Sequence, residues 1–252
     1  MYQIRNLFEN DDVRILDEKG AYCVLEYQRD LSVTPESAQT AYFANEMNVR
    51  KRQLVCDISK SPVMVQSGAM QWMVGDVGAR TGVKGIGDLL GKAVRGSVTG
   101  ESAIKPVYTG SGMLLLEPTY KYILMLDLEE WGRSIVLEDG LFLACDAGLK
   151  QRAVMRSSVS SAVAGNEGLF NLGIEGSGIV CLESYCPKEE LVEVTLQNDV
   201  LKIDGNFAIA WSGSLNFTVE KSGKTLIGSA ASGEGLVNTY RGTGKVLLAP
   251  VL

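Results

Sequence analysis

The sequence of 252 residues predicts an all-β protein built from three tandem copies of one module, which follow a distinct N-terminal segment. Two observations predict this fold. A glycine turn of the form G-S/T-G recurs three times at equal spacing, and an apolar run follows it each time. Elsewhere, short segments alternate between apolar and polar residues, which is typical of strands with one face in a core.

The repeat is clearest in three segments around these turns. They read YTGSGMLLLEP at 108–118, IEGSGIVCLES at 174–184 and YRGTGKVLLAP at 240–250. The first glycine of each turn is Gly110, Gly176 or Gly242, so the two steps along the chain are equal. Equal steps indicate a duplicated unit, since chance matches to a short glycine pattern would be spaced irregularly.

The 66-residue step divides the chain into an N-terminal extension and three modules. Their ranges are 1–52 for the extension and 53–118, 119–184 and 185–250 for the modules. A second landmark, a glycine followed by an apolar stretch, stands at Gly68, Gly140 and Gly205. The distance from this landmark to the later turn is about six residues longer in the first module. We interpret the glycine-rich stretch 75–96 as the insertion that holds this excess.

Alternation predicts individual strands within the modules. Apolar residues alternate with polar ones at Val192, Val194 and Leu196, and again at Leu215, Phe217 and Val219. Each set predicts a half-buried strand. The runs 113–116 and 246–248 are apolar throughout, which predicts strands buried on both faces or at an interface.

Glycine turns connect the predicted strands. Asp139-Gly140 and Asp204-Gly205 are typical hairpin dipeptides, because glycine adopts positive φ at little cost. The G-S/T-G turns also permit a phosphate-binding interpretation. We reject it because a phosphate loop should lead into a helix, whereas each of these turns leads into an apolar strand.

One or two short helices are expected. Thr34-Pro35-Glu36 is a strong helix start, and the helix would continue to about Met47. In the insertion, an apolar stripe predicts a second helix with one hydrophobic face, formed by Ile86, Leu89, Leu90, Ala93 and Val94. We interpret this stripe as core or interface packing, with peripheral membrane contact as an alternative.

Composition excludes several classes of function. The chain has no histidine, which removes Ser-His and Cys-His nucleophile pairs and imidazole metal sites. Its net charge of −6 argues against nucleic-acid binding, and we interpret the one dense basic run, Arg50 to Arg52, as a solvated face. No catalytic, cofactor or metal site is predicted.

The five cysteines are expected to be reduced, buried thiols, because their number is odd and no signal peptide is recognised. None forms a C-x-x-C pair, which argues against a zinc site. Residues 1–12 have neither the apolar run of a secretory signal nor the acid-poor composition of a transit peptide. No apolar stretch reaches the roughly 20 residues of a membrane span. These features predict a cytoplasmic protein.

The stretch QSGAMQWM at 66–73, the glycine-rich insertion and the closing GEGLVNTYRGTGKVLLAP at 233–250 resemble the altered-inheritance-of-mitochondria family. Its bacterial members are often compared with the tryptophan RNA-binding attenuation protein, TRAP. The resemblance covers residues 55–250. It implies three TRAP-like modules, each a short double-stranded β-helix of jelly-roll type, with pseudo-threefold symmetry. It also implies a homotrimer whose nine modules form a ring, in a bacterial member of unknown function.

The sequence favours a non-enzymatic, ring-forming scaffold or interaction protein. Three alternatives remain open: a small-ligand binder at module or subunit interfaces, an enzyme that uses Asp, Glu, Lys or Tyr across an interface, and peripheral membrane association through the apolar stripe. The extension and the insertion break the threefold symmetry, so we expect any specific function to reside there.

Overall fold

The computed structural model describes residues 1–30, 32–81, 105–155, 170–221 and 236–250. In these ranges the chain forms sixteen β-strands, one α-helix and two 3-10 helices, η1 (Leu128–Trp131) and η2 (Lys188–Glu190). The prediction of a mostly β protein is confirmed. The helix predicted around Ile86 to Val94, and most of the insertion, lie outside the described residues.

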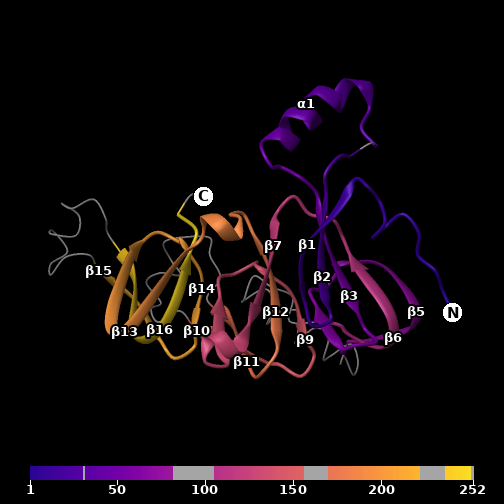
Figure 1. Cartoon of the computed structure of the whole chain (residues 1–252). Helices are drawn as coiled ribbons and strands as arrows, with labels where there is room; N and C mark the ends of the chain where they lie inside the picture. Colours follow the sequence, from indigo (N-terminus) through magenta and orange to yellow (C-terminus); the bar gives the residue numbers. More distant parts are fainter. Residues whose placement is uncertain (31, 82–104, 156–169, 222–235, 251–252) are drawn as a thin grey trace, which may run out of the picture.

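The strands form two curled antiparallel sheets that lie side by side (Figure 1). The first sheet has nine strands, in the order β1 (Val13–Lys19), β2 (Tyr22–Tyr27), β3 (Arg52–Asp57), β6 (Val107–Leu116), β4 (Val63–Val65), β9 (Phe142–Asp146), β12 (Ile179–Ser184) and β7 (Tyr122–Asp127), with β5 (Met70–Arg80) beside β6. The second has seven strands, in the order β10 (Lys150–Met155), β11 (Phe170–Glu175), β8 (Ser134–Leu137), β14 (Ala208–Ser212), β16 (Leu236–Leu248) and β13 (Val192–Asp204), with β15 (Asn216–Lys221) beside β16.

The largest core cluster contains side chains from both sheets and therefore joins them. It includes Leu124 of β7 and Leu182 of β12 in the first sheet, and Leu137 of β8 and Ala210 of β14 in the second. A separate cluster fills the second sheet, where the rings of Trp211, Phe217 and Tyr240 lie 5.1–5.3 Å apart between centroids. Strands of residues 119–184 therefore contribute to both sheets.

Strand pairings recur at the spacing of the sequence repeat. Lys150 of β10 pairs with Glu175 of β11. Asn216 of β15 pairs with Arg241 of β16, and each residue of this second pair lies one repeat after its counterpart in the first. Ala144 faces Cys181 in the same way that Ala210 faces Leu247. The corresponding pair near the start of β5 is Trp72 and Leu115. The repeat in the sequence thus appears as repeated hydrogen-bonding partners.

The G-S/T-G motifs are bends within or between strands, so our prediction of turns was wrong in this respect. Gly110 lies inside β6, Gly242 lies inside β16, and Gly176 joins β11 to β12. All three have positive φ, between 119° and 130°. The bend at Gly176 lets the chain leave the second sheet at β11 and enter the first at β12.

The two Asp-Gly dipeptides are turns, but they do not form hairpins as predicted. Gly140 and Gly205 have φ of 75° and 83°. Gly140 connects β8 to β9, which belong to different sheets, and Gly205 connects β13 to β14, which both pair with β16. The local turn chemistry was correct, whereas the strand partners depend on residues far away in the sequence.

We expect Gly110→Ala to destabilise the protein by about 1–3 kcal/mol or more, because a side chain is strained at this φ. An added Cβ would also lie 2.0 Å from the backbone oxygen of Asp76 on β5. The free energy of unfolding from urea titration checks this. The control is Gly148→Ala, where nothing lies within 4 Å of the added Cβ and we expect a change within about 0.5 kcal/mol. Equal effects of the two substitutions would contradict the account.

Candidate functional site

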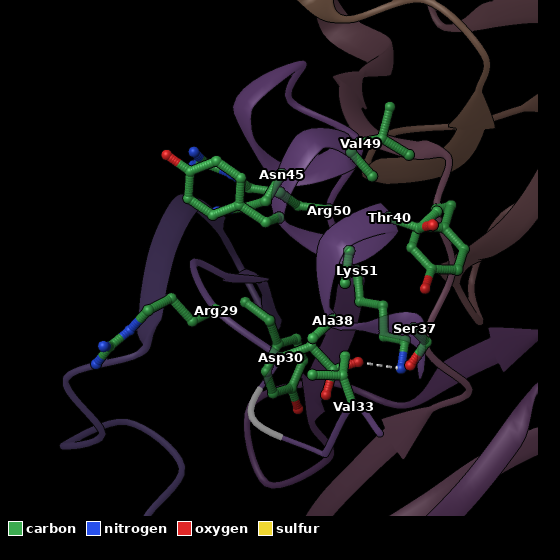
Figure 2. A pocket seen from close by; sticks show the side chains of 15 residues that line it. Arg29, Asp30, Val33, Ser37, Ala38, Thr40, Asn45, Val49, Arg50 and Lys51 are labelled. Atoms are coloured by element: carbon green, nitrogen blue, oxygen red, sulfur yellow. Dashed lines mark hydrogen bonds and ion pairs between the residues drawn. The ribbon is translucent and has the colours of Figure 1, made fainter. Parts of the chain in front are cut away.

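The candidate site is a cavity of about 510 Å³ between the helix α1 (Pro35–Glu46) and the ends of the strands below it (Figure 2). It lies in the extension, where the sequence predicted any specific function. Its lining residues come from the loop after β2, from α1, from the segment before β3 and from the loop after β6. They are Tyr27, Arg29, Asp30, Val33, Ser37, Ala38, Thr40, Ala41, Tyr42, Ala44, Asn45, Val49, Arg50, Lys51 and Tyr120.

Local sequence determines where α1 begins and ends. The backbone N–H of Thr34 donates to Ser37 Oγ at 3.1 Å, and Pro35 occupies the first helical turn, as predicted. The helix ends where Asn48 adopts φ of 61°, a conformation that asparagine tolerates better than most residues. The prediction of this helix is confirmed.

The helix stands apart from both sheets (Figure 1). None of its residues is buried, although Ala41, Ala44 and Asn45 form a half-buried stripe toward the cavity. Tyr42 and Phe43 are 62% and 58% exposed. Core packing therefore contributes little to holding α1 in place, and the polar contacts at its two ends must position it.

Arg52 makes the strongest of these contacts. Its side chain is 1% exposed, and its Nε and Nη2 atoms lie 2.9 Å and 2.7 Å from Glu26 Oε2. Nη2 also donates to the backbone oxygen of Asn48 at 3.2 Å, and the guanidinium lies 3.8 Å from the ring centroid of Tyr122. Arg52 thus joins strand β2, the end of α1 and the start of β7.

The other two cations of the basic run, Arg50 and Lys51, line the cavity. Lys51 Nζ lies 2.6 Å from Asp30 Oδ2, and this hydrogen bond lowers the pKa of Asp30 to about 2 and raises the pKa of Lys51 (Figure 2). Arg50 Nη1 donates to Gln28 Oε1 at 2.7 Å and lies 3.3 Å from Glu26 Oε1. The Nε atom of Arg50 is buried and has no hydrogen-bond partner within the described part of the chain.

Our interpretation of Arg50 to Arg52 as a solvated face was therefore wrong. The side chains of Arg50 and Arg52 are 23% and 1% exposed. Both pair with Glu26 on β2, and Lys51 pairs with Asp30 in the loop after it. The sequence signal that could have revealed this is Glu26, which stands near the end of an otherwise apolar strand, YCVLEY, and so needs a buried cation.

The cysteines agree with the prediction of free and mostly buried thiols. Four of the five are buried, and Cys23 is half-buried at the wall of a second cavity of about 290 Å³. Burial raises the pKa of Cys23 and of Cys145 to about 12. Since the thiolate is the reactive form, these thiols are poor nucleophiles near neutral pH. No group of residues that could hold a metal ion occurs in the described ranges.

These features define a two-sheet antiparallel β-protein with an internal repeat and a helical extension that covers a cavity. The chain belongs to the AIM24 family, described as "Mitochondrial biogenesis AIM24", whose sequence model matches residues 46–251. This confirms the family suggested by the motifs around Gln66 and Gly233. The match begins at the last residue of α1, so most of the cavity lining precedes the matched range.

Two bacterial proteins illustrate the similarity. An uncharacterized protein of Streptococcus pyogenes serotype M6 is 32% identical over an alignment of 194 residues, and the alignment covers 74% of this chain and 75% of that protein. The crystal structure of a protein from Streptococcus pyogenes has a TM-score of 0.59 at 28% identity, and the alignment covers 81% of this chain and 90% of the other. In the described part of this chain, no helix has the length and apolar character needed to cross a membrane.

Proposed function

We propose that this chain is a non-enzymatic scaffold of three TRAP-like modules that joins head to tail with further copies and closes as a homotrimeric ring. The observation that carries this proposal is a pair of unmatched strand edges, on β13 and on β5, at opposite ends of the molecule (Figure 1).

Two equivalent junctions occur inside the chain. In the first, β4 pairs with β9 through Val65 and Ala144, and in the second, β8 pairs with β14 through Leu137 and Ala210. The step from Ala144 to Ala210 equals one repeat, and the step from Val65 to Leu137 exceeds it by about six residues. This difference equals the excess length of the first module, which supports the proposal that the modules are copies.

The same steps predict a third junction, which needs a second chain. A further repeat from Leu137 reaches Ile203 in β13. The longer step of the first module, which is one repeat plus the excess of about six residues, leads back from Ala144 to Trp72 in β5. Within the described residues, β13 pairs only with β16, and β5 pairs only with β6. Each of these strands therefore presents unpaired backbone groups along one edge, which can accept a strand of another chain.

Exposed apolar side chains accompany both edges. On β5, Met70 and Met73 are 38% and 42% exposed, and near the other edge Val200 and Phe207 are 41% and 38% exposed. Burial in a contact between copies would account for these apolar side chains, which a single chain leaves exposed to solvent. Such a contact joins two different surfaces, so repeated copies form either a ring or a filament. The family resemblance favours a ring of three chains.

A non-enzymatic role fits the residues that are present. The chain has no histidine, and burial keeps the thiols of Cys23 and Cys145 protonated near neutral pH. Burial raises the pKa of Tyr22 and of Cys181 strongly, and these two residues are 2% and 0% exposed. These observations support assembly, and not chemistry, as the role of the β-modules.

Charge reversal across the proposed junction tests the assembly. The repeat places Met73 opposite Lys202, so Met73→Lys should oppose two positive charges and shift the protein to a monomer at micromolar concentration in light scattering. Lys202→Glu added to Met73→Lys should restore the assembly. Ile15→Lys, at a 43% exposed position on β1, is the matched control and should leave the mass unchanged. A mass that Met73→Lys does not alter would contradict this junction.

A further inference from the structure

We propose that the cavity under α1 binds a small aromatic ligand that carries a single negative charge, such as an aromatic carboxylate. This inference concerns the extension and is independent of the assembly proposed for the β-modules. It rests on the size of the cavity, on the type of its walls and on the charge balance of the ion pairs around it.

The size of the cavity suits a small molecule. Its volume of about 510 Å³ lies within the range of roughly 300–1,000 Å³ that is usual for small-molecule sites. The side chains of α1 leave much of this space unfilled, because three of its lining residues, Ala38, Ala41 and Ala44, are alanines. Since the helix has no buried residue, a ligand would bury apolar surface that the fold itself leaves in contact with water.

The walls favour a flat apolar body. Tyr27 and Tyr120 line the side formed by the strand ends, and Tyr42 lines the side formed by the helix. Tyr27 is fixed because its hydroxyl donates to Gln53 Oε1 at 2.7 Å. Aromatic rings prefer offset or edge-on contact with other rings, and such pairs contribute free energy beyond the area that they bury. An aromatic ligand is therefore the best match for three tyrosines.

The charges favour an anion. Four cations and three carboxylates form the ion pairs at this site, since the guanidiniums of Arg50 and Arg52 share the one carboxylate of Glu26. One positive charge is therefore not balanced within the group, although the chain as a whole has a net charge of −6. Among the lining residues, Asp30 is the one acid beside three bases. A monoanionic ligand would restore the balance.

The positions of the cationic side chains around the cavity support the same ligand. Lys51 Nζ lies 6.0 Å from the ring centroid of Tyr120, so a cation and an aromatic wall are neighbours in the cavity. Arg50 has a hydrogen-bond donor, Nε, that is used by no other described residue. Arg29 extends away from the helix toward Asp12, so its guanidinium is turned away from the cavity (Figure 2).

Fluorescence titration with two related probes tests the proposal. The probes are 8-anilinonaphthalene-1-sulfonate, an aromatic monoanion, and N-phenyl-1-naphthylamine, which has the same ring system without the charge. Lys51→Met should weaken binding of the anionic probe about fivefold, and Asp30→Asn should strengthen it by a similar factor. Binding of the neutral probe should change less than about twofold in both variants.

This pair of variants separates binding from structure, because each substitution breaks the same Lys51–Asp30 ion pair. A purely structural role would move the affinity for the anionic probe in the same direction in both variants, and that result would overturn the proposal. Ala41→Trp should fill the cavity and abolish binding of both probes, with unchanged far-ultraviolet circular dichroism. Persistent binding in Ala41→Trp would place the probe elsewhere and would also overturn it. Met73→Lys should leave the affinity unchanged, whatever its effect on assembly.

Discussion

Arg52→Met is expected to lower the free energy of unfolding by about 3–5 kcal/mol, which is typical when one partner of a buried ion pair is removed. Arg52 is 1% exposed and Glu26 is 5% exposed at the side chain, so solvent cannot replace the lost contact. The substitution also removes one of two donors to the backbone oxygen of Asn48, which keeps only the Tyr122 hydroxyl at 3.4 Å among side chains in the described ranges. Because Asn48 ends α1, the helix should lose its orientation before the sheets unfold.

Unfolding by guanidinium chloride, at one fixed protein concentration, measures this change in the free energy of unfolding. The control is Arg133→Met, which removes an exposed ion pair with Glu129 and should change the free energy of unfolding by no more than about 1 kcal/mol. Hydrogen exchange of the α1 amides gives the local result. If Arg52→Met and Arg133→Met have equal effects, Arg52 does not anchor the extension as we describe.

Trp211→Ala should have an effect of the same size, about 3–5 kcal/mol, because it leaves a large cavity in the core of the second sheet. Trp211 is 1% exposed, and its ring lies 5.3 Å from the rings of both Phe217 and Tyr240 between centroids. It also pairs through β14 with Val136 of β8 and Val246 of β16. The substitution should therefore weaken the pairing of β14 with β8 and β16 as well as the core itself.

The comparison for this prediction is Phe43→Ala. Phe43 is 58% exposed on α1, outside the lining of the cavity, and its loss should change stability by about 0.5 kcal/mol or less. Thermal unfolding monitored by near-ultraviolet circular dichroism reports on the packing of Trp211 directly. A Trp211→Ala protein as stable as Phe43→Ala would contradict the assignment of this tryptophan to a structural core.

Features that depend on local sequence patterns could be predicted from the sequence. The G-S/T-G spacing predicted equivalent positions, and the alternation at Leu215, Phe217 and Val219 predicted a half-buried strand. In the structure Leu215 and Phe217 are buried and Val219 is half-buried. The helix start at Thr34-Pro35 was also visible, because capping and a fixed proline φ act within a few residues. These signals depend only on neighbours in the chain.

Features that depend on distant partners were missed. The Asp139-Gly140 turn looks like a hairpin locally, yet its two strands belong to different sheets. Val192 fits the alternation of a core strand but is 46% exposed, because β13 lies at the edge of its sheet. The basic run looked solvated because Glu26, the partner of Arg52, lies far from it in the sequence. Sequence periodicity contains no information about such pairings.

The cavity could not be located from the sequence, although the extension was expected to hold any specific function. Its walls come from four separate segments, and no repeat relates them to the modules. Small residues on one side of α1, Ala41 and Ala44, leave space that a larger side chain would occupy. A helix with small residues on its inner face and a buried ion-pair anchor at its end is consistent with a covering element over a binding site.

The proposed ring depends on the third junction, in which β13 of one chain would pair with β5 of the next. The most direct test is the molar mass of the full chain, measured by light scattering after size-exclusion chromatography at micromolar concentration. We expect a single species with three times the mass of one chain, which is 27.2 kDa. A species of 27.2 kDa across the whole concentration range would contradict the account, because both strand edges would then be stable without a partner.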